Sequence, residues 1–465
     1  MQISIITQEF NLQSFQMNKK KYIVFFLISA LFTSCSFDNK SGIWKGGEEE
    51  KRKVAQLEEE QKAEANTTKI YSSENKYSKE KSISRKITLS KPENNSSWTM
   101  PGLNHQNNLG NLYLTGIKSK FLKKKVGKNK FSLSKITSSP LAHKNSIIFS
   151  DDRGTIYKIG YSGKLKWKQN IYKKIYKKIY KNLNFSFYKN NIYISDNIGF
   201  IYAISLNSGE LIWIKNHGIP LKSYIKIYEK KVYLVNQDNR ILCLDQKNGS
   251  IVWDIRSTKS FIKSQNLLSL AITPDGLLLV LSSAGDLLKI RANSGKIYWS
   301  LKISAFSFIQ DSDFFASSNI VIDNKNIIFS TQSSIFSINL DNGYLNWKRD
   351  LSLRNTPIVD EKHIYLVSDN GYFMNLDKLT GEIISSTNIL KVLKRKRQKT
   401  QISGFIIGSE KVYATTFNGY LIVCSANSGK VERYKKIGDT ITADPIISNG
   451  ELFILTDNSR LFGFS

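Results

Sequence analysis

NSGKIYW, at residues 293–299, is one of five closely similar heptapeptides in this chain. The other four are YSGKLKW, NSGELIW, KNGSIVW and DNGYLNW, at 161–167, 207–213, 247–253 and 341–347. Each has glycine in its third position and tryptophan in its seventh. Glycine readily adopts the positive φ that a tight hairpin requires, and Asn or Asp beside it tolerates the same region. The heptapeptide therefore predicts a hairpin turn that leads into a tryptophan-bearing strand.

The turn glycine recurs at intervals of 38 to 48 residues, the period of a β-propeller blade. It occurs at Gly163, Gly209, Gly249, Gly295, Gly343, Gly381 and Gly429. Upstream of each glycine stand short apolar segments that alternate as strands do, for example at 191–199 and 411–419. A helical repeat is excluded because the turn glycines interrupt any helical period. Four antiparallel strands in about 45 residues make one blade, so the repeat predicts an all-β propeller.

A tryptophan follows each of the first five turn glycines by four residues, at Trp167, Trp213, Trp253, Trp299 and Trp347. We expect these rings on the outermost strands, where each covers the seam between two blades and donates a hydrogen bond through its indole N–H. Ser385 and Arg433 take the same position in the sixth and seventh units, which predicts weaker seams there. A ligand site lined by the five indoles is disfavoured, because equivalent positions in every blade form a peripheral ring.

The repeat leaves an unfinished last unit. Residues 439–465 supply three strands and stop where the next turn glycine is expected. The fourth strand must come from upstream of the first unit, and NLYLTGI at 111–117 is the candidate. This arrangement predicts eight four-stranded blades, the last closed by N- and C-terminal strands, with no free sheet edge. Seven blades with a separate tail is the alternative.

Composition sets limits on the class of protein. The 465 residues are 41% hydrophobic and 12% aromatic, enough for a large core, and carry a formal charge of +30. The three cysteines are far apart, which excludes a disulfide scaffold and a CxxC metal site. Basic clusters occur at 123–125, 171–181 and 394–397. For each cluster a solvated loop is favoured over a binding patch.

The N-terminus indicates where the chain resides. From Met17 it reads MNKKKYIVFFLISALFTSC: three lysines, an apolar run and small residues that end at Cys35. This pattern is typical of a secretion signal, and Met17 is the better start. Export removes chromosomal DNA as a partner and leaves acidic proteins, anionic lipid head groups or composition bias to account for the charge. We expect residues 1–34 to hold the upstream segment and signal, 35–97 a flexible linker with a short solvated helix, and 98–465 the propeller.

Two features of the sequence resemble a known family. Phe32-Thr-Ser-Cys35 is similar to a bacterial lipobox, an ordinary signal peptide with an incidental cysteine being the alternative. The repeat resembles DGxLYAxDxxTGxxxW of pyrroloquinoline-quinone-type propellers over residues 136–465. Together with WTMPGLNH at 98–105, these features resemble the BamB family of outer-membrane lipoproteins. The resemblance implies that Cys35 is lipidated and that the chain is anchored to the outer membrane, facing the periplasm.

The resemblance also implies a function and a site. It implies a non-catalytic scaffold, without cofactor or metal, that binds the POTRA domains of BamA within the β-barrel assembly (BAM) complex and helps to deliver unfolded outer-membrane proteins. In that family BamA docks on connections between blades. The corresponding residues here are Phe261, Ile262 and Lys263 in one connection and Asp311 and Asp313 in the next. Solvated loops are the alternative reading of both segments.

Two other functions stay open at this point. Quinoprotein dehydrogenases share the repeat, but those enzymes are longer, bind calcium and often carry adjacent cysteines. This chain has no such cysteine pair, and His105, His143, His217 and His363 stand singly. No catalytic spacing or phosphate loop is recognisable, so we expect no enzyme. The third possibility is an exported propeller that binds another envelope protein or a polysaccharide.

Overall fold

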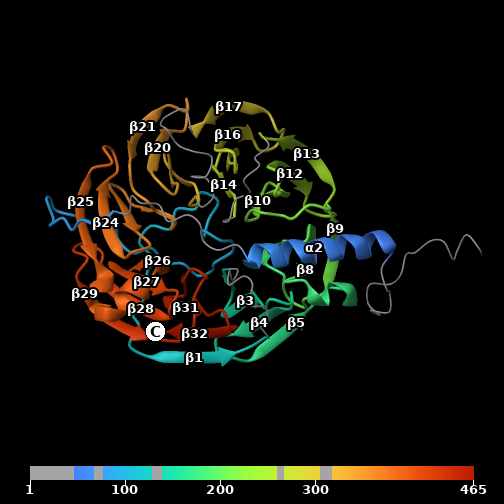
Figure 1. Ribbon diagram of the computed structural model, residues 1–465, viewed down its shortest axis with the longest axis horizontal. Helices are drawn as coiled ribbons and strands as arrows, with labels where there is room; N and C mark the ends of the chain where they lie inside the picture. The colour runs from blue at the N-terminus through green and yellow to red at the C-terminus, as the bar shows by residue number, and fades with distance from the viewer. Residues whose placement is uncertain (1–46, 67–76, 128–138, 259–266, 304–316) are drawn as a thin grey trace, which may run out of the picture.

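The computed structural model describes residues 47–66, 77–127, 139–258, 267–303 and 317–465. Within these residues the strands form eight four-stranded antiparallel sheets around one axis (Figure 1). In seven sheets the four strands are consecutive in the chain, and the first of them lies nearest the axis. The predicted eight-bladed β-propeller is therefore confirmed.

The first four blades run from residue 141 to residue 302. Blade 1 contains β2 (Leu141–Ala142), β3 (Ser146–Ser150), β4 (Ile156–Gly160) and β5 (Leu165–Gln169). Blade 2 contains β6 (Leu183–Tyr188), β7 (Asn191–Asp196), β8 (Phe200–Ser205) and β9 (Leu211–Asn216). Blade 3 contains β10 (Lys226–Tyr228), β11 (Lys231–Val235), β12 (Arg240–Asp245) and β13 (Ile251–Arg256). Blade 4 contains β14 (Ser269–Ile272), β15 (Leu277–Leu281), β16 (Asp286–Arg291) and β17 (Ile297–Lys302).

The last four blades complete the ring. Blade 5 contains β18 (Val321–Asp323), β19 (Asn326–Ser330), β20 (Ile335–Asn339) and β21 (Leu345–Arg349). Blade 6 contains β22 (Ile358–Val359), β23 (His363–Val367), β24 (Tyr372–Asp377) and β25 (Ile383–Asn388). Blade 7 contains β26 (Ile402–Gly408), β27 (Lys411–Thr416), β28 (Tyr420–Ser425) and β29 (Val431–Lys436). Blade 8 contains β30 (Ile446–Ser448), β31 (Glu451–Leu455), β32 (Arg460–Phe464) and β1 (Lys120–Lys125).

The strand that closes blade 8 is not the one that the sequence predicted. β1 pairs antiparallel with β32, whereas Leu112 forms isolated bridges with Glu93 and Gly408. Leu112 and Leu114 are both buried, which suits a segment wedged between two blades. An outermost strand needs little burial, and only Leu122 of β1 is buried. The prediction of residues 111–117 was therefore wrong in its position, although the closure of the blade by both ends of the chain is confirmed.

The repeated hairpin has the backbone that glycine permits. Gly209 has a φ of +78°, and its N–H donates to Ser205 O at 2.9 Å. The other six turn glycines have φ between +69° and +82°. A β-bulge follows in each outer pair, directly after the residue that faces the tryptophan position, as between Ala203 and Ile204 opposite Trp213. This bulge recurs in blades 1 to 7.

The tryptophans join neighbouring blades as predicted. Four of the five indoles donate a hydrogen bond to a carbonyl of the next blade: Trp167 to Leu206, Trp213 to Gln246, Trp253 to Ala292 and Trp347 to Lys378, at 2.9 to 3.1 Å. Trp299 Nε1 is buried without a partner among the described residues. The equivalent carbonyl, Leu340 O, accepts from Lys289 Nζ at 3.0 Å. This bond does not itself exclude the indole, because Leu206 O in blade 2 accepts from both Lys158 Nζ and Trp167 Nε1.

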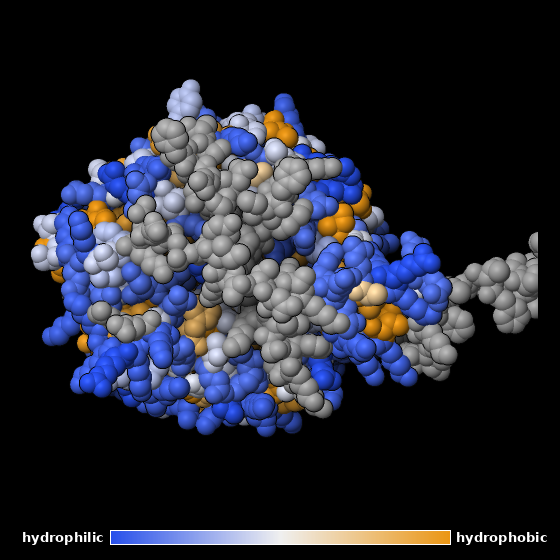
Figure 2. Space-filling view, in the orientation of Figure 1, coloured by the Kyte–Doolittle hydropathy of each residue, from blue (hydrophilic) through white to orange (hydrophobic). Residues whose placement is uncertain are grey.

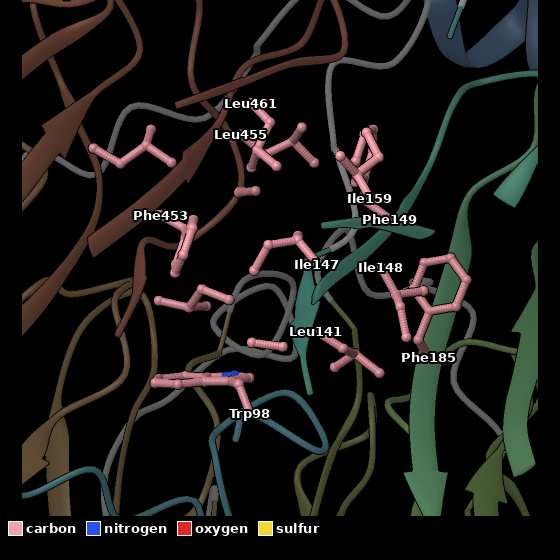
Figure 3. Close-up of a cluster of buried hydrophobic side chains, with 14 of the residues drawn as sticks. Trp98, Leu141, Ile147, Ile148, Phe149, Ile159, Phe185, Phe453, Leu455 and Leu461 are labelled. Carbon is pink, nitrogen blue, oxygen red and sulfur yellow. The ribbon is translucent and has the colours of Figure 1, made fainter. Parts of the chain in front are cut away.

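The ring closes over its largest apolar cluster (Figure 3). Phe453, Leu455 and Leu461 of blade 8 face Ile147 and Ile159 of blade 1, and all are buried. The same cluster continues into blades 2 and 7. The two ends of the chain are thus joined by side-chain packing as well as by the β1–β32 pairing, and burial of this kind contributes roughly 25 cal/mol per Å² of apolar surface.

Two of the three basic clusters are not loops. Lys123–Lys125 lie in strand β1. Residues 394–397 lie in the 3-10 helix η4 (Ile389–Lys399), which contacts β24 and β29. The third cluster contains the 3-10 helix η1 (Lys174–Lys178), in which Tyr176 is buried. The prediction of loops was wrong for these elements, although Lys123, Lys124 and Lys125 are solvent-exposed as predicted. In the third cluster, Tyr176 lies between lysines and packs against helix α2 (Glu48–Asn66).

The described residues before the ring also contact it. Helix α2 (Glu48–Asn66) lies against η1, and Lys81 pairs with Ser386 of β25 through two backbone hydrogen bonds of 2.9 Å. Ser386 is next to Ser385, where the sequence lacks the seam tryptophan, so the N-terminal segment covers that edge. Among the helices that the structure describes, none is both long and apolar enough to cross a membrane.

Candidate docking face

The propeller has two faces that differ in their connections. One carries the connections from the outer strand of one blade to the inner strand of the next, and we call it the interblade face. The other carries the first and third hairpin turns of each blade, including the seven repeated glycines, and we call it the turn face. Residues 90–98 of the N-terminal segment lie on the turn face, where Ser90 N donates to Asp360 Oδ2 at 2.7 Å and Asn449 N to Asn95 O at 2.7 Å. The predicted docking residues belong to interblade connections.

The predicted site residues lie outside the described part of the chain. Phe261, Ile262 and Lys263 fall between Thr258 and Leu267, and Asp311 and Asp313 fall between Ile303 and Ser317. Cys35 also lies outside it. The assignments of these residues therefore stay predictions. Hydrogen bonds hold the described ends of both connections.

The connection from blade 3 to blade 4 leaves from a hydrogen-bonded base. Asp286 Oδ2 accepts from Ser257 Oγ at 2.8 Å and from Thr258 N at 3.2 Å. Asn239 Nδ2 donates to Thr258 O at 2.9 Å, and Asn239 Oδ1 accepts from Ser283 N at 3.1 Å. Asn239 has a φ of +58°, a conformation that asparagine tolerates in a tight turn. Side chains of both blades thus fix the start of this connection.

The connection from blade 4 to blade 5 is fixed at both described ends. Ile303 is buried, and its N–H donates to Gly285 O at 2.9 Å. On the other side Ser318 and Ser330 exchange hydrogen bonds, Ser318 N to Ser330 O at 2.8 Å and Ser330 N to Ser318 Oγ at 2.9 Å. The first connection therefore starts, and the second starts and ends, at hydrogen-bonded points of the same face.

Helix α2 lies on the interblade face over blade 2 (Figure 1). Val54 and Leu57 of this helix are buried and pack against Tyr176 and Ile179 of the η1 connection. Tyr176 Oη donates to Glu50 Oε1 at 2.8 Å. The other exposed side chains of α2 are mostly charged, so the helix adds a polar surface beside the two connections described above. The sequence predicted the helix but not its contact with the ring.

Buried charges lie beneath α2. Asp196 accepts from Tyr172 Oη at 2.5 Å and from the backbone N–H groups of residues 198–200. Burial raises the pKa of Asp196 to about 6 despite these donors. Burial also lowers the pKa of Lys181 to about 8, although the carboxylates of Asp196 and Asp152 oppose that shift. These charges fix the η1 connection on which α2 rests.

The axis of the ring contains a pocket, partly open to solvent and lined by polar and apolar residues, with an empty volume of about 530 Å³. Tyr224, Asn319, Thr356 and Asp444 line it, each two residues before the equivalent inner-strand position of its blade. Gly404 holds the same position in blade 7, where a Cβ would collide with Asp444 Oδ1. The side chain of Asp444 is exposed within the channel. Desolvation by the protein around it nevertheless raises the pKa of its carboxyl to about 6.

The turn-face end of this channel is closed by residues 98–109. Lys226, which is buried, donates through Nζ to Asn104 O at 2.7 Å and to Asn107 Oδ1 at 2.6 Å. Burial lowers the pKa of Lys226 to about 7. Asn107 Nδ2 in turn donates to Leu270 O and Ile320 O of two neighbouring blades, at 2.9 and 2.8 Å. Hydrogen bonds thus hold this segment, which contains WTMPGLNH at 98–105, across several inner strands.

The axial groups were not singled out from the sequence. No local sequence motif marks Asp444 or Lys226. Their place at the axis becomes apparent only when the inner strands of the blades are aligned with one another. The four histidines are apart, and His105 Nε2 lies 2.6 Å from Ile227 O. Across the described residues there is no group of three or more His, Cys, Asp and Glu side chains that could hold a metal ion. Trp98 lines the pocket, and its Nε1 is buried without a hydrogen-bond partner among the described residues.

The fold is similar to that of known propellers. The chain resembles the crystal structure of BamB from Moraxella catarrhalis with a TM-score of 0.58 and 11% identity, over 74% of this chain and 100% of that one. It resembles quinohemoprotein alcohol dehydrogenase from Comamonas testosteroni with a TM-score of 0.61 and 9% identity, over 79% of this chain and 80% of that one. At these identities the likenesses establish the fold alone.

Sequence comparison identifies the family within this fold. The chain is 21% identical to outer membrane protein assembly factor BamB of Moranella endobia (strain PCIT), over 58% of this chain and 69% of the relative. It is 20% identical to the protein of the same name from Yersinia pestis, over 57% and 69%. The family model described as outer membrane protein assembly factor BamB matches residues 152–387, just over half of the chain. The repeated hairpins, the ring that they build and this match together place the chain in the BamB family of outer membrane protein assembly factors.

Proposed function

We propose that this chain is a non-catalytic scaffold of the BAM complex and assists the assembly of outer-membrane β-barrel proteins. Membership of the BamB family, through residues 152–387, is the observation that carries the proposal. The relatives are named for outer membrane protein assembly. In this proposal the ring supplies a rigid surface, and its partners are BamA, other BAM subunits and unfolded outer-membrane proteins.

The interblade face around blades 3 to 5 is the proposed docking surface for the POTRA domains of BamA. Phe261, Ile262 and Lys263 would supply the apolar and cationic part, and Asp311 and Asp313 the acidic part. Hydrogen bonds from both neighbouring blades hold Ser257 and Thr258, the start of the first connection. A docking loop that leaves from a rigid base loses less conformational entropy when it binds, which favours affinity.

The proposed location is the periplasmic side of the outer membrane, with Cys35 as the lipidated residue. A lipid at Cys35 would attach the chain 13 residues before α2 begins at Glu48. Labelling with a radioactive fatty acid in cells tests this step. The native protein should take up the label, the Cys35→Ser protein should not, and uptake by both would contradict the assignment.

The docking proposal is tested by measuring the affinity of the purified chain for the periplasmic domains of BamA. Asp311→Lys/Asp313→Lys should weaken binding by at least tenfold, since reversing paired charges costs more than removing them. Asp275→Lys/Asp341→Lys is the matched control, because it reverses two exposed carboxylates of blades 4 and 5 on the turn face. Equal loss in both variants would contradict the assigned face.

The alternatives give different results in the same preparations. If the native chain fails to bind BamA but captures another envelope protein or a polysaccharide, the scaffold would serve a different partner. Reduction of a redox dye by the purified protein, loaded with calcium and the quinone, would contradict the non-catalytic assignment.

A further inference from the structure

The outer strands of blades 7, 8 and 1 form one continuous basic strip along the edge of the ring. The strip consists of residues 430–436, 118–125 and 164–169, which contain β29, β1 and β5, and we call it the basic rim. In Figure 1 these three strands follow one another along the lower edge. They belong to consecutive blades, so the strip crosses the closure of the ring.

The charge of the basic rim is one-sided. Its three segments contain twelve lysines and arginines and one acidic residue, Glu432. The corresponding segments of the other five blades, 209–216, 249–256, 295–302, 343–349 and 381–388, contain six basic and three acidic residues together. The overall excess of lysine therefore does not explain the strip, because the other edges of the same ring lack it.

The cations of the basic rim lack anionic partners among the described residues. All twelve are exposed, and none forms an ion pair among the described residues. The single acidic residue, Glu432, forms an ion pair with Lys411 of β27, which is not part of the basic rim. Twelve unpaired like charges repel one another, and this repulsion is relieved when an anionic surface approaches.

Each strand of the basic rim also exposes one large apolar side chain among its cations. These are Tyr434 in β29, Phe121 in β1 and Leu165 in β5, with 48%, 39% and 44% of their surface exposed. Figure 2 shows this edge, along the bottom of the view, as mostly hydrophilic with isolated hydrophobic residues. Lysines interspersed with aromatic and aliphatic side chains are typical of surfaces that meet a membrane interface.

A hollow lies in the middle of the basic rim, at the seam where the tryptophan is missing. Arg433 takes the tryptophan position, and its guanidinium lies beside Ile117 O at 3.4 Å. The hollow has an empty volume of about 330 Å³, and Lys118, Lys120 and Lys435 join Arg433 at its edge. Four cations around one recess suit a phosphate group, because each can donate a hydrogen bond to it.

We propose that the basic rim binds the surface of an anionic phospholipid bilayer, with phosphate head groups against the lysines and Phe121, Leu165 and Tyr434 at the interface. The ring then stands with its edge on the membrane. Both faces stay accessible in this orientation, including the interblade face assigned to the partner. An anionic bilayer complements the basic rim, because the rim combines a run of cations without ion pairs with isolated apolar side chains suited to the membrane interface.

Vesicle sedimentation with the full chain tests the proposal. The vesicles are phosphatidylcholine alone, or equal parts of phosphatidylcholine and phosphatidylglycerol. We expect the native chain to bind the anionic vesicles more tightly, with an excess that high salt removes. Lys123→Gln/Lys124→Gln/Lys125→Gln should weaken binding to anionic vesicles on the order of a hundredfold, from about 1 kcal/mol per lysine. A second variant, Lys166→Gln/Lys168→Gln/Lys435→Gln, should weaken binding to anionic vesicles to a similar degree. It leaves the sequence of β1 unchanged, so its effect cannot come from a disturbed β1.

The matched control is Lys215→Gln/Lys296→Gln/Lys302→Gln, which removes three exposed lysines in or next to the outer strands of blades 2 and 4. This variant has the same net charge as the rim variants and should keep most of the native affinity. Equal loss in the control would show a general charge effect and overturn the proposal. Equal binding of the native chain to both kinds of vesicle, or retention on an acidic polymer such as heparin without vesicle binding, would overturn it too.

Discussion

The indole of Trp347 lies against Gly381, the turn glycine of the next blade, so closely that a Cβ on Gly381 would come 2.5 Å from Trp347 Cε3. The same relationship links the other seam tryptophans to their neighbours. It is loosest between Trp299 and Gly343, where the corresponding distance is 3.4 Å. The glycine therefore serves two purposes, a positive φ in the turn and space for the ring of the preceding blade.

Gly381→Ala should destabilise the protein more than Gly343→Ala. Both glycines have positive φ, +69° and +75°, so alanine should cost each turn roughly 1 kcal/mol. Only at Gly381 does the new methyl group also overlap an indole, which should add about 1 to 3 kcal/mol. Urea unfolding of the two variants measures the difference. Equal losses would mean that the tryptophan contact does not constrain the turn.

Trp253→Phe should cost more stability than Trp299→Phe. Both changes remove a similar apolar area, but Trp253 Nε1 donates to Ala292 O at 2.9 Å, whereas Trp299 Nε1 has no partner among the described residues. The lost hydrogen bond should separate the two by about 1 kcal/mol. Melting temperatures of both variants provide the test, and an equal or larger loss at residue 299 would contradict the seam geometry.

Asp444→Asn should change how stability depends on pH. The surrounding protein raises the pKa of Asp444 to about 6, above the ordinary value of about 3.9. Between these values the folded chain keeps a proton that the unfolded chain has released, so rising pH destabilises the native protein across that window. The asparagine variant should be the more stable one at pH 8 and lose this advantage toward pH 4. Denaturant unfolding over this range provides the measurement, and a difference independent of pH would contradict the prediction.

Leu57→Ala should release α2 from the interblade face without unfolding the ring. Leu57 is one of two buried apolar residues through which the helix packs on η1. Loss of this contact should leave a solvated helix that is marginal by itself. Hydrogen exchange of the amides in residues 48–61 should become fast, while the strands remain protected. Gln56→Ala, at an exposed position of the same helix, is the control and should keep slow exchange.

Features that have a short-range sequence pattern could be predicted, whereas contacts between residues far apart in the chain could not. The turn glycines and seam tryptophans recur at fixed spacing, so the blades and their number could be predicted. β1 could not, because an outermost strand needs only one buried residue, Leu122, and leaves almost no pattern. The bonds of Lys226 to residues 104 and 107 span more than a hundred positions and have no local signal. The docking residues stay predictions that rest on resemblance.

The most direct test of the scaffold assignment is site-specific photo-crosslinking in cells. A photoreactive amino acid replaces Thr258, at the start of the blade 3 to blade 4 connection, or Asp275, on the turn face of blade 4. We predict that the probe at residue 258 crosslinks to BamA and that the probe at residue 275 does not. Crosslinking to BamA from residue 275 alone, or from neither residue in a protein that is folded and exported, would contradict the account.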